Sequence, residues 1–224
     1  MATETITPLR AELDRLVVPA AAELIDHPYY RGLADGSLPG AALSALCRQD
    51  NHHLLPTYAR ALAQCAAVAT RHDHGRLLAK MSLVSFESAL SSAAGFPGLA
   101  REFGLPDADG GAPEIAETTA KYVAFLRMST VSPAAGLGAV LPSAWLYQLV
   151  TDDLMARRDP DTRYGGLIAI MYPGTEFVTL IEEFLTLLEE FWADTAADHD
   201  VLLAHVEQAI AHEKAFVDAA WQAG

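Results

Sequence analysis

Apolar residues return every three to four positions along almost the whole chain, which is the spacing of one face of an α-helix. Alanine and leucine dominate these stretches, whereas Val, Ile and Thr do not gather in the alternating runs that are typical of strands. Because 51% of the 224 residues are hydrophobic, the chain can bury a large core. We therefore expect an all-α fold, a helical bundle formed by a single domain that spans residues 1–224.

Turn-forming residues divide the periodic stretches into separate helices. The expected helices cover residues 7–25, 39–54, 56–71, 74–93, 114–130, 133–158, 162–171, 175–194 and 199–221. The expected breaks contain Gly, Pro or Asp and fall at 34–40, 95–98, 104–113, 157–163 and 172–175. Pro56 lies between two expected helices, and because it lacks an amide hydrogen it either ends the first helix or kinks a longer one.

The chain is strongly acidic, with 15 Lys and Arg against 29 Asp and Glu and a formal net charge of −14. Nucleic acids and anionic membranes bind clustered Lys and Arg, so we expect neither as a partner. The opening residues, MATETITPLR, do not resemble a signal peptide, and no apolar run approaches the roughly 18 residues of a membrane span. Cys47 and Cys65 cannot form a disulfide framework. We expect a cytoplasmic protein.

Two carboxylates lie on helix faces that the periodicity assigns to the core. Glu213 precedes Phe216 on the inward stripe of the last expected helix, and Asp50 follows Leu43 and Cys47 on that of 39–54. A lone ionised carboxylate in the core is unfavourable, so each must be paired, protonated or beside a wet cavity. Either residue alone could be a hydrogen-bonded core group, or could be exposed if the register slips by one residue. Two such cases in one helical chain favour a shared polar pocket.

Hydroxyl groups also occur on apolar helices. In LPSAWLY (141–147), Ser143 and Tyr147 are four residues apart and therefore share a helix face. Tyr122 and Tyr172 likewise lie on apolar stretches. These groups would line a ligand pocket, or they are structural: helical serines often bond back to a carbonyl, and buried tyrosines are common.

Metal ligation is not expected. The chain contains no ExxH and no HExxH, the spacings with which helix bundles and metalloproteases hold metal ions. His52 and His53 are adjacent and project in different directions from a helix. There is also no GxSxG motif, and neither cysteine has an evident activating partner.

Several motifs together resemble the TenA family, also called thiaminase II. Residues 27–70 are similar to its amino-terminal signature, in which H-P-[FY], G-x-L-P, Q-D and Y-A-R-A-L-A follow one another. LPSAWLY resembles the family's LPC-x-WLY segment, YPGTEF resembles its Tyr-x-x-x-x-[FW] stretch, and AHEKAFVDAAW is similar to its closing helix. The motifs occur in the family's order over nearly the whole chain.

The resemblance implies a helical bundle of the haem-oxygenase-like kind, usually assembled as a homotetramer. It implies hydrolysis of aminopyrimidines derived from thiamin, for salvage of the pyrimidine, with no metal and no organic cofactor. By the same resemblance, Asp50 would hold the pyrimidine amino group and ring nitrogen, and Glu213 would be the acid–base residue. Tyr147, Tyr172 and Tyr122 match tyrosines that line the family's pocket.

Two positions depart from the family pattern. Ser143 stands where thiaminase members have their nucleophilic cysteine, and His53 stands where they have a tyrosine. A serine hydroxyl is almost wholly un-ionised near neutral pH and is a far poorer nucleophile without a base. The chain therefore resembles more closely the family branch that lacks the cysteine, which is linked to salvage of formylamino- or aminomethyl-pyrimidine.

These observations predict a metal-independent aminopyrimidine hydrolase. The expected substrate is 4-amino-5-aminomethyl-2-methylpyrimidine or its N-formyl derivative, with Glu213, Asp50 and Ser143 as catalytic residues and with His53 and the three tyrosines binding substrate. A non-catalytic binder of a small aromatic ligand is the alternative, favoured by the changes at Ser143 and His53. The family has also been labelled a transcription regulator, but the negative charge and the lack of a basic recognition helix argue against DNA binding.

Overall fold

The computed structural model describes residues 9–106 and 111–224, and this part of the chain consists of helices and loops without a strand. The α-helices are α1 (Leu9–Ile25), α2 (Pro28–Asp35), α3 (Gly40–Gln49), α4 (Leu55–Val68), α5 (His72–Phe103), α6 (Glu117–Ser129), α7 (Pro133–Ala156), α8 (Gly165–Met171), α9 (Gly174–Asp194) and α10 (His199–Gln222). A π-helical turn, η1 (Asp50–Leu54), joins α3 to α4, and a 3-10 turn, η2 (Ala196–Asp198), precedes α10. The expected all-α fold is confirmed.

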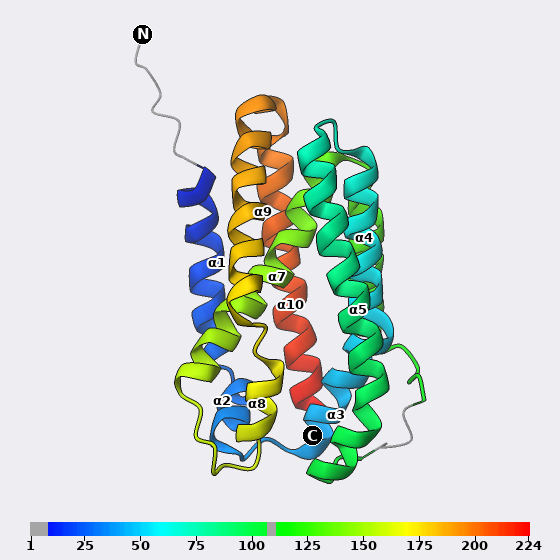
Figure 1. The fold of residues 1–224 in the computed structure, drawn as a ribbon, viewed down its shortest axis with the longest axis vertical. Coiled ribbons are helices and arrows are strands. Elements are labelled where there is room, and N and C mark those ends of the chain that lie inside the picture. The colour runs from blue at the N-terminus through cyan, green and yellow to red at the C-terminus, as the bar shows by residue number, and fades with distance from the viewer. Residues whose placement is uncertain (1–8, 107–110) are drawn as a thin grey trace.

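The long helices run along the long axis of the molecule, whereas α2, α3 and α8 gather at one end beside the C-terminus (Figure 1). Helix α7 passes through the middle of the bundle, where it contacts α1, α4, α6, α9 and α10. Its residues are buried on all sides, as expected for a helix enclosed by others. None of the helices in the described residues is long and apolar enough to cross a membrane.

Two glycines let α7 approach its neighbours closely. A Cβ atom added to Gly138 would lie 2.3 Å from the main-chain oxygen of Leu202 on α10. One added to Gly136 would lie 2.8 Å from Sγ of Cys65 on α4. The distance between α7 and α10 is therefore fixed by backbone contact, and these are the helices that carry Ser143 and Glu213.

The expected break at 95–98 is wrong, because α5 continues through Pro97 as far as Phe103. Phe96 and Ala100 are only 3% and 0% exposed, so their burial holds the last turns of α5 in place. The helix ends at Gly104, which has a φ of 60°. The next amide, of Leu105, donates to the carbonyl of Ala100 at 2.7 Å, which closes a Schellman motif. Residues 107–110 of the break expected at 104–113 lie outside the described residues.

Helix α2 lies in a stretch for which no helix was expected. Pro28 starts it, the ring nitrogen Nδ1 of His27 accepts the amide hydrogen of Tyr29 at 3.1 Å, and Gly36 ends it with a φ of 82°. A helix of eight residues is too short for a periodicity signal, but a proline at its start and a glycine after its end are the usual boundary signals. This helix brings Tyr30 towards the middle of the bundle.

Candidate active site

Asp50 and Glu213 come together inside the bundle. Asp50 begins η1 and Glu213 lies midway along α10, and both side chains are only partly accessible. Burial, together with the negative charge of Glu213, raises the pKa of Asp50 to about 7. Burial likewise raises the pKa of Glu213 above its usual value. Because two neighbouring carboxylates repel each other, the pair retains a proton up to about neutral pH.

The π-turn sets the direction of Asp50. Within η1 the amide of Leu55 donates to the carbonyl of Asp50, five residues back rather than four. Pro56 follows directly; it has no amide hydrogen to donate, and its ring would clash with the carbonyl four residues back in a regular helix. The helix therefore neither ends nor simply kinks at Pro56. Instead, the turn before Pro56 contains one extra residue. Such widened turns occur often at functional sites.

Two hydroxyl groups act on Glu213 and partly offset the effect of its burial. The Tyr122 hydroxyl donates a hydrogen bond to Oε1 of Glu213 at 2.6 Å, and the Ser143 hydroxyl is a second hydrogen-bonding neighbour with a smaller effect. Both favour the ionised carboxylate and so lower the pKa of Glu213 from the value that burial alone would give. The His212 ring stacks on Tyr122 with centroids 5.1 Å apart and planes at 8°, which fixes the phenol ring.

Tyr147 and Cys47 lie on the side of Asp50. The Tyr147 hydroxyl donates to the carbonyl oxygen of Met171, so it is the ring of this residue, 40% exposed, that remains open to a ligand. Burial and the charge of Asp50 raise the pKa of the Cys47 thiol to about 12. A thiol with this pKa is protonated near neutral pH, and Cys47 therefore offers no thiolate nucleophile.

Two tyrosines at the site were not predicted from the sequence. Tyr30 on α2 is partly buried, and its pKa is raised by burial and then by the charges of Glu213 and Asp50. Tyr58 on α4 is 6% exposed, its hydroxyl has no hydrogen-bond partner, and after burial the charge of Glu213 is the largest cause that raises its pKa. In the sequence, the place of Tyr58 on the apolar stripe of α4 indicates that its side chain is buried, but not that it lies at a site.

Two of the expected site residues have their polar groups bonded to other partners. Nε2 of His53 is 2.9 Å from the carbonyl oxygen of Pro113, which can only accept, so this nitrogen donates to the segment before α6. The Tyr172 hydroxyl pairs with Asp152, and burial and that carboxylate together raise its pKa. Hydrogen bonds and electrostatic contacts thus link Asp50, Glu213, Ser143, Tyr122 and Tyr147, whereas His53 bonds to Pro113 and Tyr172 to Asp152.

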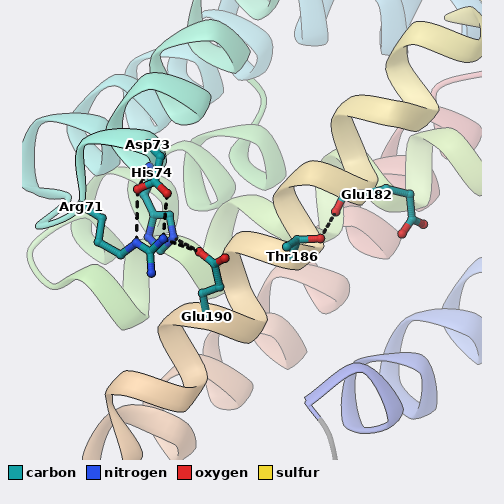
Figure 2. A network of polar contacts seen from close by, with 6 residues as sticks. All are labelled: Arg71, Asp73, His74, Glu182, Thr186 and Glu190. Carbon is teal, nitrogen blue, oxygen red and sulfur yellow. Dashed lines mark hydrogen bonds and ion pairs between the residues drawn. The ribbon is translucent and has the colours of Figure 1, made fainter.

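One group of residues has the geometry of metal ligands within the described residues. The potential ligand atoms of Asp73, His74 and Glu190 lie within 4.8 Å of one another, between the start of α5 and α9 (Figure 2). However, the Arg71 guanidinium pairs with Asp73 at 2.8 Å and with Glu190 at 3.1 Å. Because this cation already pairs with both carboxylates, and Nε2 of His74 lies 2.7 Å from Oε2 of Glu190, the group is better explained as a polar network that joins the two helices.

The central arrangement supports proton transfer next to a bound heterocycle. One carboxyl group, on Asp50, is available to pair with a ligand, and the other, on Glu213, is held by hydroxyl groups that tune its pKa. The pKa of Asp50, about 7, allows this group both to donate and to accept a proton near neutral pH, and burial moves the pKa of Glu213 in the same direction. Tyrosine rings from four other helices, α2, α4, α6 and α7, lie near the pair, as expected for a site that binds a flat, partly apolar ligand.

Comparison with known proteins agrees with this geometry. The sequence profile described as the TENA/THI-4/PQQC family matches residues 15–223. No curated protein matches the chain significantly.

Three solved structures share the fold. A TenA family transcription regulator from Silicibacter sp. TM1040 has a TM-score of 0.79 at 18% identity, with 98% of this chain and 99% of that chain covered. A TenA-like protein from Sulfolobus solfataricus P2, described as a candidate thiaminase, has a TM-score of 0.74 at 20% identity, with 97% of both chains covered. A Shewanella denitrificans domain with a heme oxygenase-like fold has a TM-score of 0.72 at 15% identity, covering 97% of this chain and 94% of that chain. The expected haem-oxygenase-like bundle is confirmed.

Proposed function

The chain belongs to the TENA/THI-4/PQQC family, and on this premise we propose that it hydrolyses aminopyrimidines derived from thiamin. The substrate is 4-amino-5-aminomethyl-2-methylpyrimidine or its N-formyl derivative, and the reaction serves salvage of the pyrimidine. The observation that carries the proposal is the pairing of Asp50 with Glu213 inside the bundle, where the two pKa values are raised for the reasons given above.

Asp50 binds the pyrimidine ring. A carboxyl group forms two hydrogen bonds with a 4-aminopyrimidine, because one oxygen accepts from the exocyclic amino group while the other meets the neighbouring ring nitrogen. A proton must lie between that nitrogen and the oxygen. With a pKa of about 7, Asp50 can supply this proton near neutral pH or leave it on the ring. An unperturbed aspartate, which is ionised at neutral pH, could only accept it.

Glu213 transfers the proton at the reacting substituent. It protonates the departing amine when water attacks the methylene carbon of the aminomethyl substrate, or activates water towards the carbonyl carbon of the formyl substrate. The Tyr122 hydroxyl holds its Oε1 at 2.6 Å, so the second carboxylate oxygen faces the substrate. Ser143, the other hydroxyl neighbour of Glu213, positions this water.

Cleavage of thiamin itself is not part of the proposal. That reaction requires a thiolate to displace the leaving group, and position 143 holds a serine. Cys47 lies by Asp50, but its thiol, with a pKa of about 12, has no base that would ionise it. The serine at position 143 and the protonated Cys47 both favour the cysteine-lacking branch of the family.

A non-catalytic pyrimidine binder is the second candidate. It is favoured by Ser143 and His53, which replace a cysteine and a tyrosine of the family pattern, and by the hydrogen bond of His53 to the Pro113 carbonyl. Regulation by DNA binding is named for one structural neighbour, but the net charge of −14 on this chain opposes it.

The test is a turnover assay, read by mass spectrometry, on thiamin, the aminomethylpyrimidine and its N-formyl derivative in parallel. We expect conversion of at least one of the two aminopyrimidines and no cleavage of thiamin. Thiamin cleavage would contradict the assignment of Ser143, and saturable pyrimidine binding without turnover would favour the binder.

A further inference from the structure

The Gln49 side chain joins two parts of the site that are distant in sequence. Its Nε2 donates to the carbonyl oxygen of Glu114 at 2.8 Å, and its Oε1 accepts the amide hydrogen of Ala116 at 3.0 Å. The two partners fix the orientation of the amide group, because a flipped amide would place donor against donor and acceptor against acceptor. One side chain thus pairs with the extended segment before α6 as a neighbouring strand would.

One of these bonds acts at the N-cap of α6. Ala116 is the N-cap of α6 and has no side-chain group that could cap the helix, and no side chain of α6 caps it either. In a capping box, a Glu or Gln three residues further on accepts the N-cap amide hydrogen. Gln49 accepts that hydrogen from another helix instead. The start of α6 is therefore set by α3 rather than by its own sequence.

Both ends of this connection reach the carboxylate pair. Asp50 directly follows Gln49 in the chain, at the change from α3 to the π-turn. Tyr122 lies in the second turn of α6 and donates to Glu213 at 2.6 Å. A shift of α6 along its axis would move the Tyr122 hydroxyl away from Glu213, and the hydrogen bond weakens steeply with distance and angle.

Two neighbouring side chains also bond to the segment before α6. Arg48 donates to the carbonyl of Gly111 at 3.2 Å, and Nε2 of His53 donates to that of Pro113 at 2.9 Å. Both bonds lie before residue 114, so they hold the segment but do not reach the N-cap of α6. The Gln49 side chain accepts the amide hydrogen of Ala116 itself, at 3.0 Å.

We propose that Gln49 is a positioning residue, whose amide sets the place of α6, and with it the Tyr122 hydroxyl, relative to Asp50 and Glu213. The kinetic consequence of this inference rests on the proposed function. The structural consequence does not, because the state of Glu213 can be measured in the protein without substrate.

The direct measurement is the pKa of Glu213, followed by NMR on protein labelled with ¹³C at the glutamate side-chain carboxyl carbons. A Glu213→Gln variant assigns the signal. The groups that face Glu213 are Asp50, Tyr30, Tyr58, Tyr122 and Ser143, and among them Tyr122 makes the hydrogen bond that most lowers its pKa. Gln49→Met removes both amide bonds at similar side-chain volume, so the pKa of Glu213 should rise.

A matched control uses the same helix and the same stretch of chain. The Ser44 hydroxyl donates to the carbonyl of Pro106 at 2.9 Å, so Ser44→Ala removes one side-chain bond to the main chain without touching α6. It should leave the pKa of Glu213 unchanged. If Gln49→Met fails to fold, Ala116→Pro tests the same contact from the other side, because it removes the amide hydrogen that Gln49 accepts. Ala116 has a φ of −67°, which a proline can adopt.

A double-mutant cycle tests whether the effect passes through Tyr122. In a Tyr122→Phe background the hydrogen bond to Glu213 is already absent, so Gln49→Met should cause no further rise in the pKa of Glu213. The inference is overturned if Gln49→Met changes that pKa no more than Ser44→Ala does, or if the rise persists in the Tyr122→Phe background.

Kinetics provide a second readout and separate the two claims. With an active wild-type protein, Gln49→Met should lower kcat by about tenfold or more and change KM little, because the substrate still binds Asp50. If the wild-type protein turns over none of the substrates, and Gln49→Met still raises the pKa of Glu213, the proposed function is refuted and the role of Gln49 stands. Normal turnover and an unchanged pKa in Gln49→Met would refute the role of Gln49 alone.

Discussion

A methyl group at Gly138 would push the two central helices apart. The added Cβ would lie 2.3 Å from the Leu202 main-chain oxygen, whereas ordinary contacts begin at 3.4 Å, so α7 and α10 must separate by about 1 Å. The atom in contact belongs to the backbone, and no rotamer change can relieve it. Overpacking of this kind costs ~1–3 kcal/mol of unfolding free energy. A displacement of about 1 Å between reacting groups lowers kcat on the order of a hundredfold.

The assay compares Gly138→Ala with Gly98→Ala, by denaturant unfolding and by turnover of the aminopyrimidine substrate. Gly98 lies within α5 and has open space where its Cβ would be, so Gly98→Ala should retain full activity and gain ~0.5–1 kcal/mol of stability. Gly138→Ala should lose stability and lose more kcat than KM, because Ser143 moves away from Glu213. Wild-type stability and activity in Gly138→Ala would refute the argument that contact between α7 and α10 positions the site.

Two further predictions follow from the pKa values. Tyr122→Phe removes a hydrogen bond that lowers the pKa of Glu213, so the limb of the kcat/KM pH profile that Glu213 governs should move to higher pH. This is the basic limb where Glu213 protonates the amine of the aminomethyl substrate, and the acidic limb where it activates water for the formyl substrate; if neither limb moves, Glu213 does not govern the profile. The second prediction concerns the stability of Asp50→Asn. The pKa of Asp50 is about 7 in the folded protein and about 4 in the unfolded chain, so the folded state binds the proton more tightly. The free energy of unfolding of the wild type therefore falls as the pH rises from about 4 to about 7. Asp50→Asn should therefore be more stable than the wild type at pH 8 by on the order of a few kcal/mol, and should show no such gain at pH 4. Urea unfolding at both pH values measures this, and an equal gain at both would contradict the raised pKa of Asp50.

The sequence indicated the carboxylate pair because burying a charge is unfavourable. Asp50 and Glu213 were the polar residues that interrupted apolar stripes, and a stripe tells which way a side chain points. It does not tell which stripes face each other, so the pairing depended on the fold. The sequence did not indicate that Tyr30 and Tyr58 lie at the site, because a tyrosine on an apolar face is an ordinary core residue.

Other differences arose where long-range contacts outweighed local preferences. Gly95, Pro97 and Gly98 predict a break, yet the burial of Phe96 and Ala100 keeps α5 helical through them. His53 was assigned to the site by resemblance, whereas its ring nitrogen bonds to the carbonyl of Pro113, a contact sixty residues away in the chain that local sequence does not encode.

The central claim is that Glu213 carries out the chemistry and Asp50 holds the ring. The most direct test is to compare Glu213→Gln with the wild type for both turnover and binding of the aminopyrimidine substrate. Glu207→Gln, an exposed glutamate on the same helix, serves as the control. We predict that Glu213→Gln loses nearly all turnover and still binds the pyrimidine, whereas Glu207→Gln matches the wild type. Full turnover in Glu213→Gln would contradict the account.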